Sequence, residues 1–249
     1  MKKIVLMYHD VYSSTEKESG FQYPTSYPYK ISATKFEEHV RFVYNYCKQN
    51  NISQDTFEFT FDDGGESFHR VVTPILEKYG FKGIFFISTL HIESDKFLTI
   101  EQIKALQQQG HTVASHSHSH PRNMTELSMN ELLMEWQTSV QILEKILENP
   151  VRIASIPSGY NSKDVTATAA QAGIKILYTS KPTTKYTYTS DIILIGRYVI
   201  HCNTSIETLN KIISNAYYRR KMLFRWMLIN CAKRILGTQY NNIKKYLLR

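Results

Sequence analysis

Two short motifs place carboxylates and histidines at spacings that suit metal-assisted hydrolysis. The first is Asp62-Asp63-Gly64, in which the neighbouring carboxylates point in different directions. One of them can therefore bind a metal ion while the other serves as a base. Asp and Gly also favour turns, so the same three residues could form a simple turn. The motif alone leaves these two alternatives equal.

The second motif is the run Ser115-His116-Ser117-His118-Ser119-His120-Pro121. If the chain continued as a strand, all three imidazoles would share one face, whereas a helical turn would bring only His116 and His120 together. An i, i+4 pair of neutral imidazoles is a common metal-binding arrangement. A solvated loop with incidental histidines is the alternative, but chance seldom produces this spacing.

The elements that must position these motifs follow a regular alternation of β-rich apolar runs and helix-period segments. This pattern predicts parallel strands joined by crossover helices in an α/β fold. We expect strands over residues 4–7, 56–61, 82–88, 111–115, 152–156, 174–179 and 192–200. We expect helices over residues 34–47, 66–79, 99–109, 128–147 and 163–172. Capping pairs, Thr34 with Glu37 and Ser128 with Glu131, open two of the helices.

About seven such β-α steps suit a closed barrel or an open doubly wound sheet. No glycine-rich phosphate motif follows any strand, which favours the barrel. In both architectures ligands bind at the carboxyl ends of the strands. Four polar segments occur at such ends and are expected to share one site: Tyr8–Asp10, Asp62–Gly64, His116–His120 and Pro157–Gly159.

The segments Thr60-Phe61-Asp62-Asp63-Gly64 and Gly110 to Pro121 resemble two specific motifs of the polysaccharide deacetylases. These enzymes are carbohydrate esterase family 4, with the NodB homology domain. Residues 81–87 are similar to the strand that follows the family's first motif, and residues 156–161 are weakly similar to its Pro-Tyr-Gly segment. The resemblance covers most of residues 3–207.

The resemblance implies a distorted (β/α)7 barrel and a metal-dependent hydrolase that removes N-acetyl groups from the hexosamines of a polysaccharide or its lipid-linked precursor. Asp63, His116 and His120 match the ligands of a divalent metal ion, most commonly zinc. Asp62 matches the catalytic base, and the backbone N–H of Ser158 matches a donor to the oxyanion. An N-acetylated carbohydrate is the implied substrate.

The leaving amine needs a general acid, and a histidine is the usual choice. Many family members carry it in a Leu-x-x-His motif near the end of the barrel, which is not evident in this sequence. His201, after residue 200, is one candidate. His9 is the other, because residues 6–11 resemble the circularly permuted branch that deacetylates poly-N-acetylglucosamine. We favour His9, which directly follows a predicted strand and precedes Asp10.

Three departures from the family pattern leave room for another substrate. Gly65 replaces a proline, which we expect to loosen the loop, and Ser158 replaces an aromatic residue that could stack on a sugar. Ser155 replaces an arginine that often contacts the base, so Asp62 lacks that partner unless Arg197 supplies it. The alternatives are therefore a hydrolase of another amide, such as a cyclic imide or ureide, and a non-catalytic carbohydrate-binding relative.

The net charge of +8 is concentrated at the end of the chain, because residues 208–249 carry ten Lys or Arg and no Asp or Glu. We therefore divide the chain into a barrel, residues 1–207, and a basic amphipathic helical tail, residues 208–249. The barrel is nearly neutral, which argues against a nucleic-acid partner. The tail could contact an anionic membrane, or it could pack its apolar side on the barrel. These two interpretations are equal on the sequence.

The three cysteines, Cys47, Cys202 and Cys231, are odd in number and widely spaced, which predicts reduced thiols. Residues 4–7 form too short an apolar run for the core of a signal peptide. We therefore expect a cytoplasmic protein, membrane-peripheral if the tail binds lipid. The sequence does not specify an oligomeric state.

Overall fold

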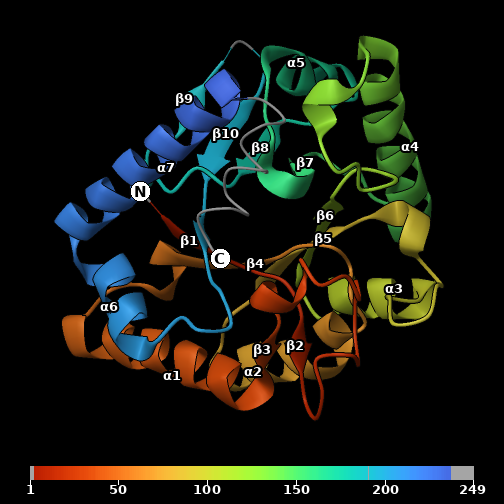
Figure 1. The fold of residues 1–249 in the computed structure, drawn as a ribbon. Coiled ribbons are helices and arrows are strands. Elements are labelled where there is room, and N and C mark those ends of the chain that lie inside the picture. The colour runs from red at the N-terminus through yellow and green to blue at the C-terminus, as the bar shows by residue number, and fades with distance from the viewer. Residues whose placement is uncertain (1–2, 190, 237–249) are drawn as a thin grey trace.

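The computed structural model describes residues 3–189 and 191–236, the side chains of 232–236 excepted. In this part of the chain a mostly parallel sheet curls into a barrel, and seven α-helices surround it as a ring (Figure 1). The strands are β1 (Ile4–Tyr8), β2 (Val11–Tyr12), β3 (Ile31–Ser32), β4 (Phe57–Phe61), β5 (Gly83–Ile87), β6 (Thr112–Ser115), β7 (Ile153–Ser155), β8 (Ile176–Thr179), β9 (Thr187–Tyr188), β10 (Ile193–Gly196) and β11 (Tyr198–Val199). The helices are α1 (Ala33–Asn50), α2 (Thr73–Lys78), α3 (Ile100–Gln108), α4 (Met129–Leu147), α5 (Lys163–Gln171), α6 (Ile206–Ser214) and α7 (Ala216–Leu236). The predicted α/β barrel is confirmed.

The two ends of the main sheet are not hydrogen-bonded to each other among the described strands. Only the chain itself connects them, where β10 continues into β11. Its order is β11-β1-β4-β5-β6-β7-β8-β10-β9, with β9 antiparallel to β10 and the other pairs parallel. β10 pairs with β8 near one edge, and β11 pairs with β1 at the other edge, although only Arg197 separates the two strands in sequence. The single strand predicted over 192–200 is therefore wrong, because its two halves pair with different neighbours.

Alternate residues of each strand pack on opposite sides of the sheet. Phe57, Phe59 and Phe61 of β4 join the large apolar cluster beneath the helices. The intervening positions face the barrel interior. A small second cluster there contains Val5, Phe86, Ala114, Tyr178 and Ile195, one residue from each of five strands.

The ends of the helices confirm one capping prediction and correct another. Ser128 and Glu131 form the predicted capping box of α4. Helix α1 begins earlier than expected, because Ser32 accepts a hydrogen bond from the backbone N–H of Lys35 and thereby takes the capping position assigned to Thr34. The helix predicted over 66–79 begins as a π-helical turn at Phe68–Val72 and continues as α2.

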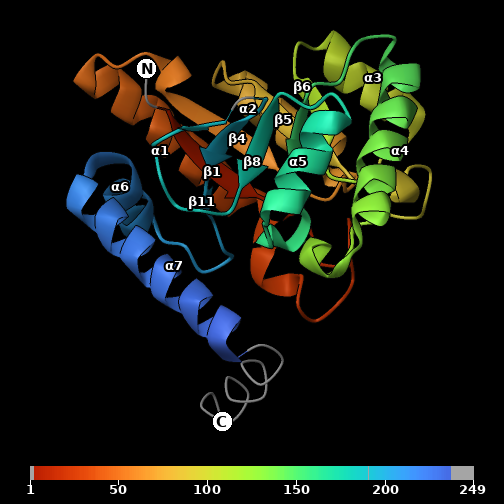
Figure 2. The ribbon, with the colours of Figure 1, turned by 90° about the horizontal axis from the view of Figure 1, so that it is seen from above.

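Two helices complete the described part of the chain on one side of the barrel. Leu209, Ile212 and Ile213 of α6 are buried in the large cluster, and Tyr218 and Met222 of α7 pack against it. Figure 2 shows α7 beside α6 at the outside of the molecule. None of the described helices is long and apolar enough to cross a membrane. The division of the chain at residue 207 stays a prediction. Residues 237–249 of the predicted tail lie outside the described residues.

A buried histidine connects α1 to the barrel and to the turn before α6. The Nδ1 atom of His39 lies 3.2 Å from the Tyr8 hydroxyl, and its Nε2 lies 3.1 Å from the Thr204 carbonyl oxygen. The neutral tautomer with a proton on Nε2 satisfies both contacts, because the hydroxyl then donates to Nδ1. Burial lowers the pKa of His39 to about 4.

This shift predicts a loss of stability in mild acid. His39 is protonated in the unfolded chain below about pH 6.5 but stays neutral in the folded chain until about pH 4, so its contribution is present at neutral pH and falls with pH. Between pH 7 and pH 5 we expect a loss of about 2 kcal/mol from this group alone. Urea unfolding of wild type and His39→Gln at both pH values measures it. An equal loss in the two proteins would contradict the assignment.

Candidate active site

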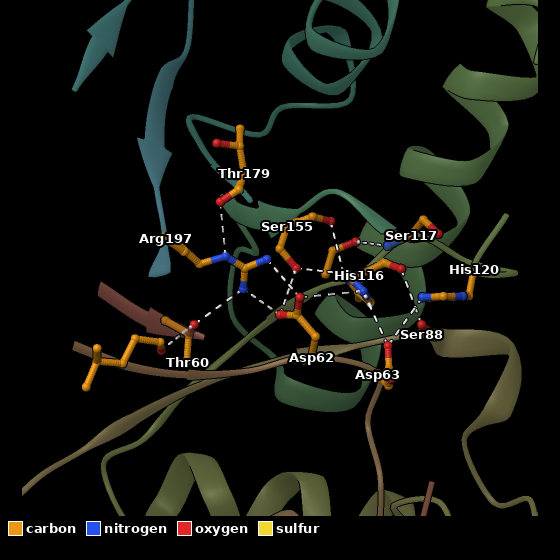
Figure 3. A network of polar contacts seen from close by, with 12 residues as sticks. Thr60, Asp62, Asp63, Ser88, His116, Ser117, His120, Ser155, Thr179 and Arg197 are labelled. Atoms are coloured by element: carbon orange, nitrogen blue, oxygen red, sulfur yellow. Dashed lines mark hydrogen bonds and ion pairs between the residues drawn. The ribbon is translucent and has the colours of Figure 1, made fainter. Parts of the chain in front are cut away.

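Every second residue of a strand faces the barrel interior, and in four strands this places one polar side chain from each in the same space. Asp62, His116, Ser155 and Arg197 each lie two residues beyond an interior position of β4, β6, β7 or β10, which are Thr60, Ala114, Ile153 and Ile195. The four side chains therefore continue onto the interior face at the carboxyl ends of the strands. Figure 3 shows them converging, with Asp63 and His120 beside them.

Asp62 is held by a two-pronged ion pair with Arg197. The Arg197 Nη1 and Nη2 atoms lie 2.6 and 2.8 Å from the two carboxylate oxygens, and both side chains are buried. Burial opposes ionisation of this carboxyl group, but Arg197, together with the nearby His116 and His9, holds the pKa of Asp62 below its usual value. Arg197 thus supplies the cationic partner of Asp62 that is missing at position 155, where the chain has a serine.

Asp63 points away from Asp62 and meets the two histidines. Its Oδ1 atom lies 3.5 Å from Nε2 of His116 and 3.3 Å from Nε2 of His120, and the three residues form a group able to hold a metal ion. Asp63 and His120 have φ angles of 91° and 56°, in the left-handed region that non-glycine residues seldom occupy. Strain of this kind gathers at functional sites, and here it turns both side chains toward one point.

The hydrogen bonds of His116 favour a tautomer that lets Asp63, His116 and His120 bind a cation. Its Nδ1 lies 2.6 Å from the Ser155 hydroxyl and 3.1 Å from the Ser155 carbonyl oxygen, and the same hydroxyl lies 3.4 Å from Asp62 Oδ1. A proton on Nδ1 satisfies the carbonyl, and Nε2 then presents a lone pair to the Asp63 carboxylate. Two electron-rich atoms facing each other in a buried site suit a shared cation, which the donor set of one carboxylate and two imidazoles can bind.

His118, the middle histidine of the motif, points elsewhere, but not because the run turns helically: residues 116–120 form no helix, and Ser117 and His120 have left-handed φ angles of 62° and 56°. The Nδ1 atom of His118 lies 2.9 Å from the Thr89 hydroxyl. The turn itself is held by Glu135 of α4, which sequence analysis missed. Its carboxylate accepts from the backbone N–H of His118 and Ser119, at 2.9 and 2.8 Å, and from the Ser119 hydroxyl at 2.6 Å. An isolated helical glutamate gives no sequence signal for this role.

A pocket of about 480 Å³ contains the predicted site residues together. Asp62, Asp63, His116, His120, His9, Ser158 and His201 all line it. His9 and His201 both contact Tyr29, with ring centroids 4.6 and 4.9 Å from its own. The buried Nδ1 of His9 has no hydrogen-bond partner among the described residues. Ser158 adopts a left-handed φ of 56°.

Gly65 is not a source of looseness, contrary to expectation. A Cβ atom at this position would lie 2.0 Å from Asp10 Oδ1, so only glycine lets the loop approach so closely. The buried Asp10 carboxylate also accepts hydrogen bonds from Ser19 and Ser67, at 2.8 and 3.0 Å. This contact fixes the loop after Asp62-Asp63-Gly64 against the segment that follows β1.

Comparison with known proteins gives one family and several relatives. The model of the family "Polysaccharide deacetylase" matches residues 49–177, a little over half of the chain. The Bacillus subtilis protein YxkH, provisionally named a polysaccharide deacetylase, is 22% identical over 192 residues, which are 72% of this chain and 64% of YxkH. A chitin deacetylase of Arthroderma benhamiae is 28% identical over 106 residues, 43% of this chain and 27% of that protein. The chain thus spans less than two thirds of either relative.

A solved structure shares the fold. The deacetylase PplD of Streptococcus pyogenes, solved in complex with acetate, superposes with a TM-score of 0.66 at 23% identity, over 85% of this chain and 98% of that one.

The ion pair at Asp62 can be tested through stability. Arg197→Met leaves Asp62 as an unpaired buried charge, so we expect the free energy of unfolding to fall by about 3–5 kcal/mol. Adding Asp62→Asn removes that charge, and the double variant is expected to be more stable than Arg197→Met alone. Urea unfolding at pH 7 measures both.

The exposed pair of Lys211 and Glu207 supplies a control, and Lys211→Met is expected to leave the unfolding midpoint unchanged. Strictly additive losses from the Arg197 and Asp62 substitutions would count against the pairing.

Proposed function

Because this chain belongs to the polysaccharide deacetylase family, we propose that it is a metal-dependent hydrolase that removes N-acetyl groups from N-acetylhexosamine units of a polysaccharide or its lipid-linked precursor. One observation carries the proposal: the ligand group Asp63, His116 and His120 lies in the same pocket as Asp62, which has its own cationic partner. Each acidic side chain is thereby free for a different task.

The ligand group would hold a divalent ion, for which zinc suits a donor set of two imidazoles and one carboxylate. When bound, such an ion supplies Lewis acidity, which makes water more acidic and a carbonyl carbon more electrophilic. Asp62 would act as the base that takes a proton from the attacking water. Its pKa, held low by Arg197, keeps it ionised at neutral pH, and the ion pair fixes the orientation of its oxygens.

His9 is the proposed general acid for the leaving amine. It lowers the pKa of both Asp62 and Asp63, which places its ring near the reacting groups, and its buried Nδ1 has no partner in the described part of the chain. Burial lowers the pKa of His201, which disfavours the protonated form that a general acid needs. The N–H of Ser158 is the proposed donor to the oxyanion. The link to the circularly permuted branch stays a prediction.

The substrate class rests on the family and on the pocket walls. The relative from Arthroderma benhamiae is named a chitin deacetylase, and chitin is a polymer of N-acetylated hexosamine. Phe21, Tyr23, Tyr29 and Tyr160 line the pocket and offer aromatic faces to a sugar ring, which compensates for the aromatic residue missing at Ser158. These walls favour a carbohydrate over a small cyclic imide or ureide.

The first test follows acetate release from N-acetylglucosamine oligomers. We expect activity to be lost on chelation and restored by Zn²⁺. The ion that the ligand group would hold is the only Lewis acid in the proposed reaction. Asp62→Asn should lower the rate about 10²- to 10⁴-fold while metal content stays that of wild type. Full activity of Asp62→Asn would refute the proposed base. Ammonia or a ring-opened product from cyclic amides, with no acetate from the oligomers, would favour the alternative hydrolase.

The second test separates the two candidate acids. His9→Asn is expected to lower the rate about 10²- to 10⁴-fold on the same oligomers, because proton transfer to the amine is lost. His201→Asn, the matched control because this ring also contacts Tyr29, should have a much smaller effect. The reverse order of effects would assign the acid to His201. The loss in His9→Asn should be smaller for a substrate whose leaving group needs no protonation.

A further inference from the structure

Helix α7 has two apolar faces, and the described residues pack against only one of them. Tyr218 and Met222 face inward and pack against the core. On the outer side Tyr217, Phe224 and Leu228 are 76%, 58% and 56% exposed. Their spacing, i, i+7 and i+11, aligns them in one stripe along the helix. The inward face satisfies the packing alternative raised by the sequence, so the outer stripe needs a separate explanation.

Basic side chains border this outer stripe. Arg220, Lys221 and Arg225 are exposed, and no Asp or Glu occurs between residues 208 and 249 to pair with them along the helix. Arg219 differs, because its guanidinium donates to the carbonyl oxygens of Ile212 and Ile213 at the end of α6. An apolar stripe edged with cations is the pattern of a helix that lies in the surface of an anionic bilayer.

The same helix also forms a wall of the active-site pocket. Trp226, between Phe224 and Leu228 in sequence, lines the pocket with His201 and the loop residues Tyr23 and Thr25. Its side chain is half-buried, whereas its neighbours on the outer stripe are exposed. Two residues turn through about 200° on an α-helix, so Trp226 lies on the side of α7 opposite Phe224 and Leu228, and the helix separates the pocket from the outer stripe.

We propose that the outer face of α7, comprising Tyr217, Phe224, Leu228, Arg220, Lys221 and Arg225, docks the protein on an anionic lipid bilayer. Resting on the proposed function, docking at a bilayer assigns the substrate to acetylated sugar chains held at a membrane by a lipid. A second copy of the chain fits this face less well, because it would bring two sets of cations together. Nucleic acid fits less well, because phosphates gain nothing from an aliphatic and aromatic stripe.

The test compares binding to vesicles of phosphatidylcholine alone and of phosphatidylcholine mixed with phosphatidylglycerol, by co-sedimentation of the full chain. We expect binding to the mixed vesicles, weakened by salt. Phe224→Ser with Leu228→Ser, and separately Arg220→Gln with Lys221→Gln and Arg225→Gln, should each weaken it at least about tenfold. The matched control is Met134→Ser with Tyr188→Ser, which removes equally exposed apolar side chains from α4 and β9 and should bind like wild type.

Acetate release from soluble oligomers is measured in parallel and should be unchanged in all these variants, which also shows that they fold. Equal binding to both vesicle types, or undiminished binding of the α7 variants, would overturn the docking surface. So would a dimer in solution that the Phe224 and Leu228 substitutions dissociate. Vesicle binding without acetate release would refute the proposed function and leave the docking surface standing.

Discussion

Two adjacent buried carboxylates must be neutralised separately, and the rest of the site follows from this constraint. Asp62 and Asp63 would repel each other if they shared one cation-free space. Asp62 continues the interior face of β4 and meets Arg197, while the left-handed φ of Asp63 turns its carboxylate toward His116 and His120. The backbone strain at Asp63 thus separates the two carboxylates, as the roles we propose for them, base and metal ligand, require.

The guanidinium that neutralises Asp62 comes from the point where the barrel closes. Arg197 is the one residue between β10 and β11, which belong to opposite edges of the sheet. Its side chain enters the barrel over the rings of Phe86 and Tyr178, with its Cζ 5.2 and 6.0 Å from their centroids. Because Arg197 holds the Asp62 carboxylate from this side, Ser155 can instead contact the imidazole of His116.

The walls of the pocket come from segments that are far apart in the chain. The segment after β1 is fixed by the Asp10 carboxylate, and α7 contributes Trp226 from the other end of the described chain. α7 is therefore both a wall of the site and, by our inference, a contact with the bilayer. A helix with two apolar faces can serve both purposes because its faces lie on opposite sides of one rigid cylinder.

The sequence by itself determined the alternation of strands and helices and the polar segments at strand ends, because these depend on local periodicity and on the common exit of parallel strands. It could also have placed Arg197 inside the barrel, since Ile193 and Ile195 set the phase, had the strand break been foreseen. Only the tertiary structure decided that break, the capping of α1 by Ser32, the need for Gly65 and the role of Glu135. Each of these depends on which distant segment lies alongside, and local pattern carries no record of such neighbours.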